Sequence, residues 1–256
     1  PGATVGYSGR IMRNVVDPNM AQGKYVNTPE TPLYHKSKIL FGYDTAKRMM
    51  MDTKSVVVVE GQMDLCMSYQ SGIHHTVAVS GTAFTDEHIH LIKRFCDTVI
   101  LSFDTDSAGQ SALKKTAMLC LLGGLDVYAV SDIGTKDPAD LIKDDPSLWH
   151  TAVKNKLHIV EKLLNDVLAS VNDDRERGKV IVRDVLPFIR AIQSPIDKAH
   201  FLHLVAQKTG ISQEILTEEL TRGILPTVSE EKEILSIKDE QTLIKKLEED
   251  MGKSLE

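Results

Sequence analysis

Short β-branched runs alternate with helical stretches between residues 55 and 130, and this alternation constrains the fold more than any other feature. Runs of this kind are typical of strands buried on both faces of a sheet. We predict strands at 56–59, 76–79, 99–103 and 127–130, and helices at 64–71, 85–95 and 111–122. Strands that alternate with helices form a parallel sheet, so the predicted fold class is α/β.

The chain on either side of this region has a different pattern. Residues 1–52 are rich in Gly, Pro, Asn and Thr and predict a small mixed α/β segment before the sheet domain, which we place at 53–150. From about residue 155, apolar residues recur on one helical face, which predicts an α-helical bundle over 151–222. Residues 223–256 are charged and weakly apolar, and we interpret them as a linker.

Cysteine usage and hydropathy indicate the cellular compartment of the protein and exclude some partners. Cys66, Cys96 and Cys120 lie far apart, without the paired spacing of a zinc site or a disulfide framework. We therefore expect no zinc and a reducing, cytoplasmic compartment. No apolar run reaches the roughly 18 residues that a membrane span needs, so no membrane partner is expected.

Charge is unevenly distributed along the chain. The net charge is −6, yet residues 1–48 carry seven Lys and Arg against three acids. A basic segment suits a nucleic-acid partner, although charge alone does not separate this from an ordinary soluble surface.

Acidic residues follow three of the four predicted strands, in the connections that begin where these strands end. The carboxyl ends of parallel strands share one edge of a sheet, where ligands bind, so these acids should converge. Converging carboxylates repel one another unless a cation is present, and Mg²⁺ prefers oxygen ligands. Two such ions would suit nucleotidyl transfer, whereas a single acid at a strand end usually makes a turn or caps a helix. The six acids are Glu60, Asp64, Asp104, Asp106, Asp137 and Asp140.

These motifs resemble the Toprim domain. The resemblance rests on Glu-Gly-x-x-Asp at 60–64, Ser-Gly-Thr at 80–82, Asp-Thr-Asp-Ser-Ala-Gly at 104–109 and Lys-Asp-Pro-Ala-Asp at 136–140. The flanks are similar to bacterial DnaG-type primases, through Lys-Tyr-Val-Asn-Thr-Pro-Glu-Thr at 24–31, Tyr-His-Lys at 34–36 and the helical segments near 194–196 and 206–212. The resemblance covers about residues 5–222.

The resemblance implies an enzyme that synthesises short RNA primers on single-stranded DNA from NTPs, with Mg²⁺ or Mn²⁺ as cofactor. It implies Glu60, Asp104 and Asp106 as core metal ligands, with Asp64, Asp137 and Asp140 around a second or third ion. It also implies a replicative helicase as a partner, through a carboxyl-terminal domain beyond this chain, which we expect to be the catalytic part of a longer protein. Contacts to the template or to nucleotide phosphates are expected from Arg10, Lys24, Tyr25, Asn27 and Lys36.

One departure and two alternatives remain open at this point. Relatives often carry Asp-Pro-Asp in the last acidic motif, but position 139 is Ala here, so Asp137 is the expected ligand and Asp140 the alternative. One alternative is another Toprim enzyme: a Mg²⁺-dependent nuclease would share the acids but lack the segment at 24–31, and a type IA topoisomerase needs a nucleophilic Tyr in a distinct domain, which nothing in this sequence frames. A non-catalytic helix-turn-helix DNA reader near 206–220 is the other alternative.

Overall fold

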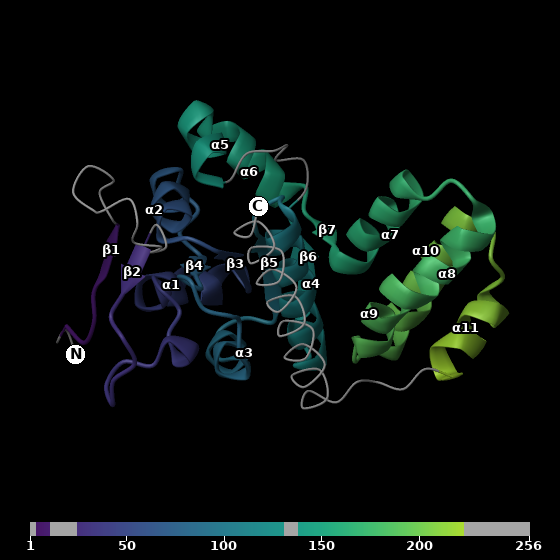
Figure 1. Ribbon diagram of the computed structural model, residues 1–256, viewed down its shortest axis with the longest axis horizontal. Helices are drawn as coiled ribbons and strands as arrows, with labels where there is room; N and C mark the ends of the chain where they lie inside the picture. Colours follow the sequence, from purple (N-terminus) through teal and green to yellow (C-terminus); the bar gives the residue numbers. More distant parts are fainter. Residues whose placement is uncertain (1–3, 11–24, 131–137, 223–256) are drawn as a thin grey trace, which may run out of the picture.

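The computed structural model describes residues 4–10, 25–130 and 138–222 of the chain (Figure 1). Near its amino end two short strands, β1 (Ser8–Arg10) and β2 (Tyr25–Asn27), pair antiparallel with Gly9 opposite Val26. A single 3-10 turn, η1 (Lys36–Lys38), then leads toward the main sheet. The first described segment is therefore mixed in character and precedes the main sheet, as predicted.

The main sheet has the strand order β4–β3–β5–β6–β7. Strands β3, β4, β5 and β6 run parallel, and β7 pairs antiparallel with β6. This mostly parallel sheet confirms the predicted α/β class. The strand bounds are β3 (Ser55–Val59), β4 (Thr76–Ala78), β5 (Thr98–Ser102), β6 (Asp126–Ala129) and β7 (Leu157–His158).

Both faces of this sheet are buried, which explains the run of valines in β3. Val56 and Val58 face one apolar core, whereas Val57 and Val59 face a second core on the opposite side. Helices α1 (Tyr43–Thr53), α3 (Asp86–Lys93) and α4 (Ser107–Leu122) contribute to the first core. The second core is closed by α2 (Gln62–Gln70), α5 (Pro138–Asp144) and α6 (Pro146–Lys154).

A helical bundle follows the sheet and shares its first core. Within it, Leu164 and Ile189 are fully buried, and α9 packs against α4 while α7 packs against β6. The bundle and the sheet therefore share one continuous apolar core. In Figure 1 the bundle helices lie beside α4. The helices are α7 (Ile159–Ser170), α8 (Asp174–Asp184), α9 (Leu186–Ala191), α10 (Pro195–Thr209) and α11 (Gln213–Arg222).

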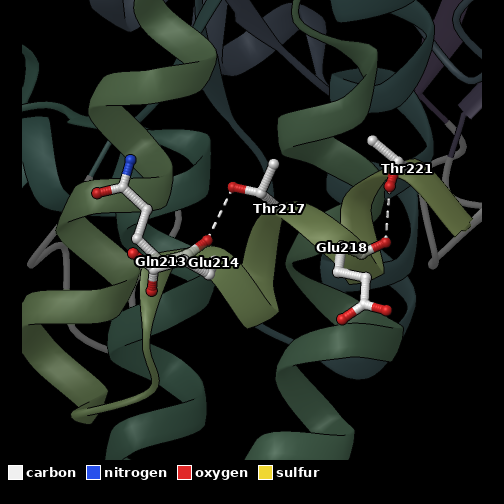
Figure 2. Close-up of a pocket in the computed structure, with 5 residues that line it drawn as sticks. All are labelled: Gln213, Glu214, Thr217, Glu218 and Thr221. Carbon is white, nitrogen blue, oxygen red and sulfur yellow. Dashed lines mark hydrogen bonds between the residues drawn. The ribbon is translucent and has the colours of Figure 1, made fainter.

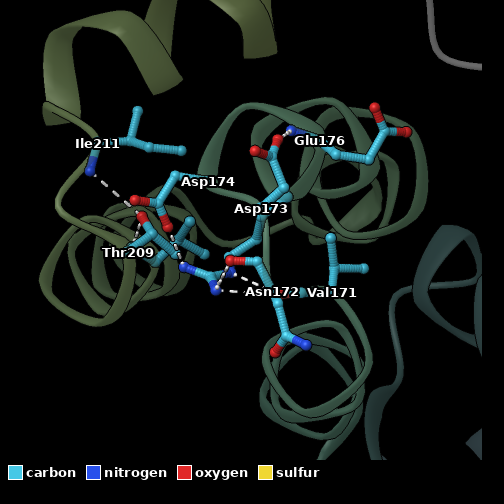
Figure 3. Close-up of polar contacts among 9 residues, drawn as sticks. Val171, Asn172, Asp173, Asp174, Glu176, Thr209 and Ile211 are labelled. Atoms are coloured by element: carbon cyan, nitrogen blue, oxygen red, sulfur yellow. Dashed lines mark hydrogen bonds and ion pairs between the residues drawn. The ribbon is translucent and has the colours of Figure 1, made fainter.

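Polar contacts fix the turn between α7 and α8 (Figure 3). Asp173 caps α8 by accepting a hydrogen bond from the Glu176 N–H (2.8 Å). Arg177 donates to the carbonyl of Val171 (3.1 and 3.0 Å) and to that of Asn172 (3.2 Å), which satisfies acceptors left open at the end of α7. The carboxyl end of α7 is thereby held in one geometry.

No helix in the described parts of the chain is long and apolar enough to cross a bilayer.

The structure corrects the predicted elements in three places. Helix α1 lies where only a mixed α/β segment was predicted, with no helix assigned, and α5 with most of α6 fills a stretch for which no helix was predicted. The helical pattern expected from residue 155 begins instead with β7, which adds to the sheet edge before α7 starts at Ile159.

Candidate active site

Two of the predicted acids meet at adjacent strand ends. Glu60 directly follows β3, and Asp104 lies two residues beyond β5, which pairs with β3 so that Val59 is opposite Ser102. The Glu60 carboxylate accepts a hydrogen bond from the Asp104 backbone N–H (Oε1 to N, 2.9 Å). The sheet therefore brings these two residues together at its carboxyl edge, where parallel sheets bind ligands.

Glu60 lies in a strongly negative environment. Partial burial raises the pKa of its carboxyl group, and the carboxylates of Asp104 and Asp106 raise it further, against the lowering effect of the Asp104 N–H bond. A carboxylate whose ionised form is disfavoured by burial and by like charges is stabilised by a bound cation. The arrangement therefore favours binding of a positive ion between the loops after β3 and β5.

Asp106 and Gly109 shape the loop that carries Asp104. Asp106 is exposed and caps α4, because its Oδ1 accepts a hydrogen bond from the Gly109 N–H (2.7 Å). A Cβ atom on Gly109 would lie 2.3 Å from the carbonyl oxygen of Asp104, which is far below a normal contact distance. The loop therefore closes tightly against the first turn of α4, and only glycine fits at position 109.

Asp64 has a different environment from the other acids. It is only 8% exposed, and its two carboxylate oxygens accept hydrogen bonds from the backbone N–H groups of Gly61 (3.1 Å) and Ala139 (3.2 Å). Asp64 thus ties the start of α2 to the start of α5, which contains the second half of the last acidic motif. Burial and backbone bonding of this kind are typical of a carboxylate that holds structure together.

The last acidic motif is only partly described. Asp140 is exposed in the first turn of α5, and Asp137 lies outside the described residues. Among the residues that the structure describes, no group of three or more His, Cys, Asp or Glu side chains is arranged to hold a metal ion. Mg²⁺ usually binds through one or two carboxylates plus waters and substrate phosphates, so the oxygen donors of Glu60 and Asp104 fit this ion in type and number.

Polar residues of the amino-terminal segment reach the same edge of the sheet. Asn27 donates from Nδ2 to the carbonyl of Ser80 (3.0 Å), and the Ser80 N–H bonds to the carbonyl of Glu60 (3.0 Å). Arg10 stacks over the Tyr25 ring at 5.9 Å, and Lys36 lines a small cavity of about 110 Å³ together with Ser80. Lys24 lies outside the described residues. Four of the five predicted contact residues are therefore described, and Asn27 is linked to the Glu60 backbone through Ser80.

Ser80 is a residue whose importance the sequence did not reveal. It adopts the left-handed region at φ 55°, which is rare for a residue with a side chain. Its hydroxyl oxygen and the Oδ1 atom of Asn27 are buried without a hydrogen-bond partner within the described structure. The only signal in the sequence is its place in the Ser-Gly-Thr loop after the second predicted strand.

A wider hollow lies away from the acids, on the outer side of α11 (Figure 2). Its described lining residues all belong to that helix, and two of their hydroxyl groups bond within the helix, from Thr217 to the Gln213 carbonyl and from Thr221 to the Glu218 carbonyl (both 2.8 Å). It combines no residues from separate elements, so we assign it no chemistry.

The environment of Glu60 predicts a stability change for Glu60→Gln. The fold raises the pKa of Glu60 above its value in the unfolded chain. Ionisation of this carboxyl group therefore lowers the free energy of unfolding as the pH rises above that unfolded value. Glu60→Gln keeps an oxygen for the Asp104 N–H and removes the charge, so it should raise the free energy of unfolding at pH 7 without divalent cations. The gain should shrink toward pH 4, where Glu60 is itself protonated. Urea titrations at both pH values measure this, and a less stable variant at pH 7 would contradict the assignment.

Comparison with known proteins agrees with this geometry. The family described as "Toprim domain" matches residues 54–131, and the family described as "DNA primase catalytic core, N-terminal domain" matches residues 1–47. A DNA primase from Borreliella burgdorferi is 33% identical over 86% of this chain and 42% of its own length. The chain spans less than half the length of such curated relatives.

Solved structures of bacterial primases also resemble this chain. The Aquifex aeolicus primase, covering its zinc-binding and RNA polymerase domains, aligns with a TM-score of 0.68 at 26% identity, over 83% of this chain and 50% of that one. A DnaG primase catalytic domain bound to single-stranded DNA aligns with a TM-score of 0.68 at 25% identity, over 82% of this chain and 66% of that one. Sequence families, relatives and structures thus agree, and the chain belongs to the bacterial DnaG-type DNA primases, whose Toprim domain it carries.

Proposed function

We propose that this chain is the metal-binding catalytic part of a primase that synthesises short RNA primers on single-stranded DNA. The observation that carries the proposal is the pairing of Glu60 with the Asp104 loop at adjacent strand ends, in a negative environment that a divalent cation would relieve. Family membership supports the reaction, because the relatives that match this chain are DNA primases. The protein would act in the cytoplasm.

The proposed chemistry is metal-dependent nucleotidyl transfer. Glu60, Asp104 and Asp106 would hold Mg²⁺ or Mn²⁺, with Asp137 and Asp140 as candidates at a second or third ion and Asp64 bracing the last motif. When bound, the cations would lower the pKa of the primer 3′-hydroxyl and neutralise charge on the departing pyrophosphate. The protein's own part is to hold these carboxylates in place at the edge of the sheet where an NTP would lie.

The template path would run over the amino-terminal segment. Arg10, Lys24 and Lys36 would neutralise phosphates, Tyr25 would stack on a base and Asn27 would position the strand beside Ser80. A DnaG catalytic domain bound to single-stranded DNA supports this partner. NTPs follow from the reaction, and a replicative helicase would bind through a domain outside this chain.

The DNA-reader alternative has little support from α10 and α11. Leu216 of α11 is buried in the bundle, and the exposed residues of that helix include Glu214 and Glu218. Arg222 is engaged by Glu218 and Glu219 in ion pairs. An acidic face repels the DNA backbone, so this pair of helices serves better as part of the bundle.

Primer synthesis is the direct test of the proposed function. The full-length protein, supplied with a single-stranded template, NTPs and Mg²⁺ or Mn²⁺, should make short RNA. Cutting of the DNA without RNA synthesis would favour a Toprim nuclease and overturn the proposal.

The basic segment gives a second test through salt dependence. Lys24→Ala combined with Lys36→Ala should weaken single-stranded DNA binding and reduce the slope of log affinity against log salt by about 1.4, at about 0.7 for each lost phosphate contact. Fluorescence anisotropy at several salt concentrations measures the slope. Lys179→Ala with Arg183→Ala, two exposed cations of α8, is the matched control. Equal slopes for the two double variants would remove Lys24 and Lys36 from the template path.

A further inference from the structure

We propose that the helical bundle positions the Asp104 loop through a polar relay from Lys162 of α7 to Gln110 of α4. The inference rests on the proposed function, because it assigns a role in that reaction to residues outside the acidic motifs. Gln110 and Lys162 would be positioning residues that touch neither substrate nor metal. The relay consists of Asp166, Lys162, Gln110 and the carbonyl of Asp104.

The peptide groups of Asp104 are held on both sides. Its N–H bonds to the Glu60 carboxylate (2.9 Å), and its carbonyl oxygen accepts a hydrogen bond from the Gln110 side-chain amide (Nε2 to O, 3.3 Å). Gln110 lies in the first turn of α4, where its own N–H bonds to the Asp106 carbonyl (2.9 Å). Among the described residues, the Gln110 side chain thus links the Asp104 carbonyl to α4.

Lys162 determines which way the Gln110 amide points. Its ammonium group donates to Gln110 Oε1 (3.4 Å), and an ammonium group can only donate. The oxygen of the amide therefore faces α7, and its NH₂ group faces the Asp104 carbonyl. Without Lys162 the amide could rotate by half a turn and place its oxygen against the Asp104 carbonyl, where two acceptors repel.

Lys162 is itself fixed more firmly than a typical surface lysine. Its side chain is 18% exposed, and Nζ bonds to Asp166 one turn later in α7 at 2.7 Å. The neighbouring Leu163 and Leu164 are buried in the core that α7 shares with the sheet. The ammonium group therefore has a defined position relative to the end of β5, and motion of α7 would be transmitted to the Asp104 loop.

An ordinary helix ion pair would give a different outcome. A pair spaced by four residues contributes roughly 0.2–0.5 kcal/mol to a helix and has no effect on a distant loop. Lys208 provides the matched control, because it bonds to Asn165 (2.9 Å) and Glu161 (3.4 Å) of the same helix without contacting Gln110 in the described structure. Lys162→Met and Lys208→Met each remove one partly buried ammonium group from the surface of α7.

Mn²⁺ affinity of the 256-residue chain, measured by electron paramagnetic resonance, is the first readout. Lys162→Met and Gln110→Met should each weaken Mn²⁺ binding by about tenfold, as expected for groups that orient metal ligands, and Lys208→Met should leave it unchanged. Because the two residues act in series, the double variant should lose no more affinity than either single variant. Lys162→Arg, which keeps the charge and the donors, should recover part of the loss.

Hydrogen exchange of the Asp104 amide is the second readout and needs no metal. Lys162→Met should raise the exchange rate of this amide by about two- to tenfold, equivalent to losing one neutral hydrogen bond. Equal exchange rates and equal Mn²⁺ affinity in Lys162→Met and Lys208→Met would overturn the relay. That result would leave the proposed function intact if the wild-type chain still binds Mn²⁺ and the full-length protein still makes primers. Faster exchange in a protein that makes no RNA would instead support the relay and contradict the function.

Discussion

Asp104→Ala should reduce primer synthesis by about a thousandfold or more. Metal ions stabilise transition-state charge by several kcal/mol, and about 1.4 kcal/mol corresponds to each tenfold in rate. The substitution removes a carboxylate beside Glu60, but it keeps the backbone N–H that bonds to Glu60. The fold should therefore remain intact while synthesis is lost, which circular dichroism and a primer assay in the full-length protein would record together.

Asp97→Ala is the matched control for this experiment. Asp97 is an exposed acid at the opposite end of the same strand, next to the start of β5. Loss of a carboxylate there should leave synthesis unchanged. Normal synthesis by Asp104→Ala, with a fold like that of the control, would remove Asp104 from the metal site.

Gly109→Ala should reduce synthesis by about a hundredfold, because a 1 Å displacement at a reacting centre has an effect of that size. A methyl group at position 109 would lie 2.3 Å from the Asp104 carbonyl oxygen, so the Asp104 backbone must move. In an isolated helix the same change would stabilise by about 1 kcal/mol. Here the clash should outweigh that gain and destabilise the fold by about 1–3 kcal/mol, as overpacking does.

Gly178→Ala separates the clash from helix propensity. Gly178 also lies inside a helix, α8, but a methyl group there would meet only the Ile211 side chain at 4.0 Å. This variant should be more stable than the wild type by about 0.5–1 kcal/mol and fully active. Thermal unfolding and primer synthesis measured for both variants decide the matter: equal activity of Gly109→Ala and Gly178→Ala would show that the Asp104 loop is not closed as described.

The sheet could be predicted from sequence because its physical signals are local. Four consecutive valines at 56–59 specify a strand buried on both faces, and a carboxylate directly after such a run lies at the ligand-binding edge. The sequence alone therefore predicts that Glu60 and Asp104 lie near each other. Gly109 ends the Asp-Thr-Asp-Ser-Ala-Gly motif, but its close approach to the Asp104 carbonyl is visible only in the structure.

Of the helices that were not predicted from sequence, α6 has a local signal for its start and α1 has none. Helix α1 starts after Gly42, which has no side chain to cap it and adopts φ 80°, so the sequence carries no cap signature. Helix α6 does carry one, because Asp145 accepts a hydrogen bond from the Ser147 N–H and Pro146 occupies the first turn. The Asp-Pro-Ser sequence at 145–147 is therefore a sufficient local signal for the start of α6.

The contacts of Asp64 and Gln110 could not be predicted, because both residues bond to partners distant in sequence. Asp64 accepts from the N–H of Ala139, 75 residues later, and Gln110 accepts from Lys162, 52 residues later. The resemblance places both Asp64 and Asp104 near metal ions, but the fold buries Asp64 against backbone donors and leaves Asp104 half-exposed beside Glu60. Only the tertiary arrangement distinguishes a bracing carboxylate from a candidate metal ligand.

We propose above that the loops carrying Glu60 and Asp104 bind the divalent cation used for nucleotidyl transfer. Anomalous diffraction from crystals soaked in Mn²⁺ tests it most directly, because it locates the ion without reference to activity. We expect an anomalous peak within about 2.0–2.3 Å of carboxylate oxygens of Glu60 and Asp104, because small divalent cations have short metal–oxygen distances. A peak only at other residues, or none at millimolar Mn²⁺, would contradict it.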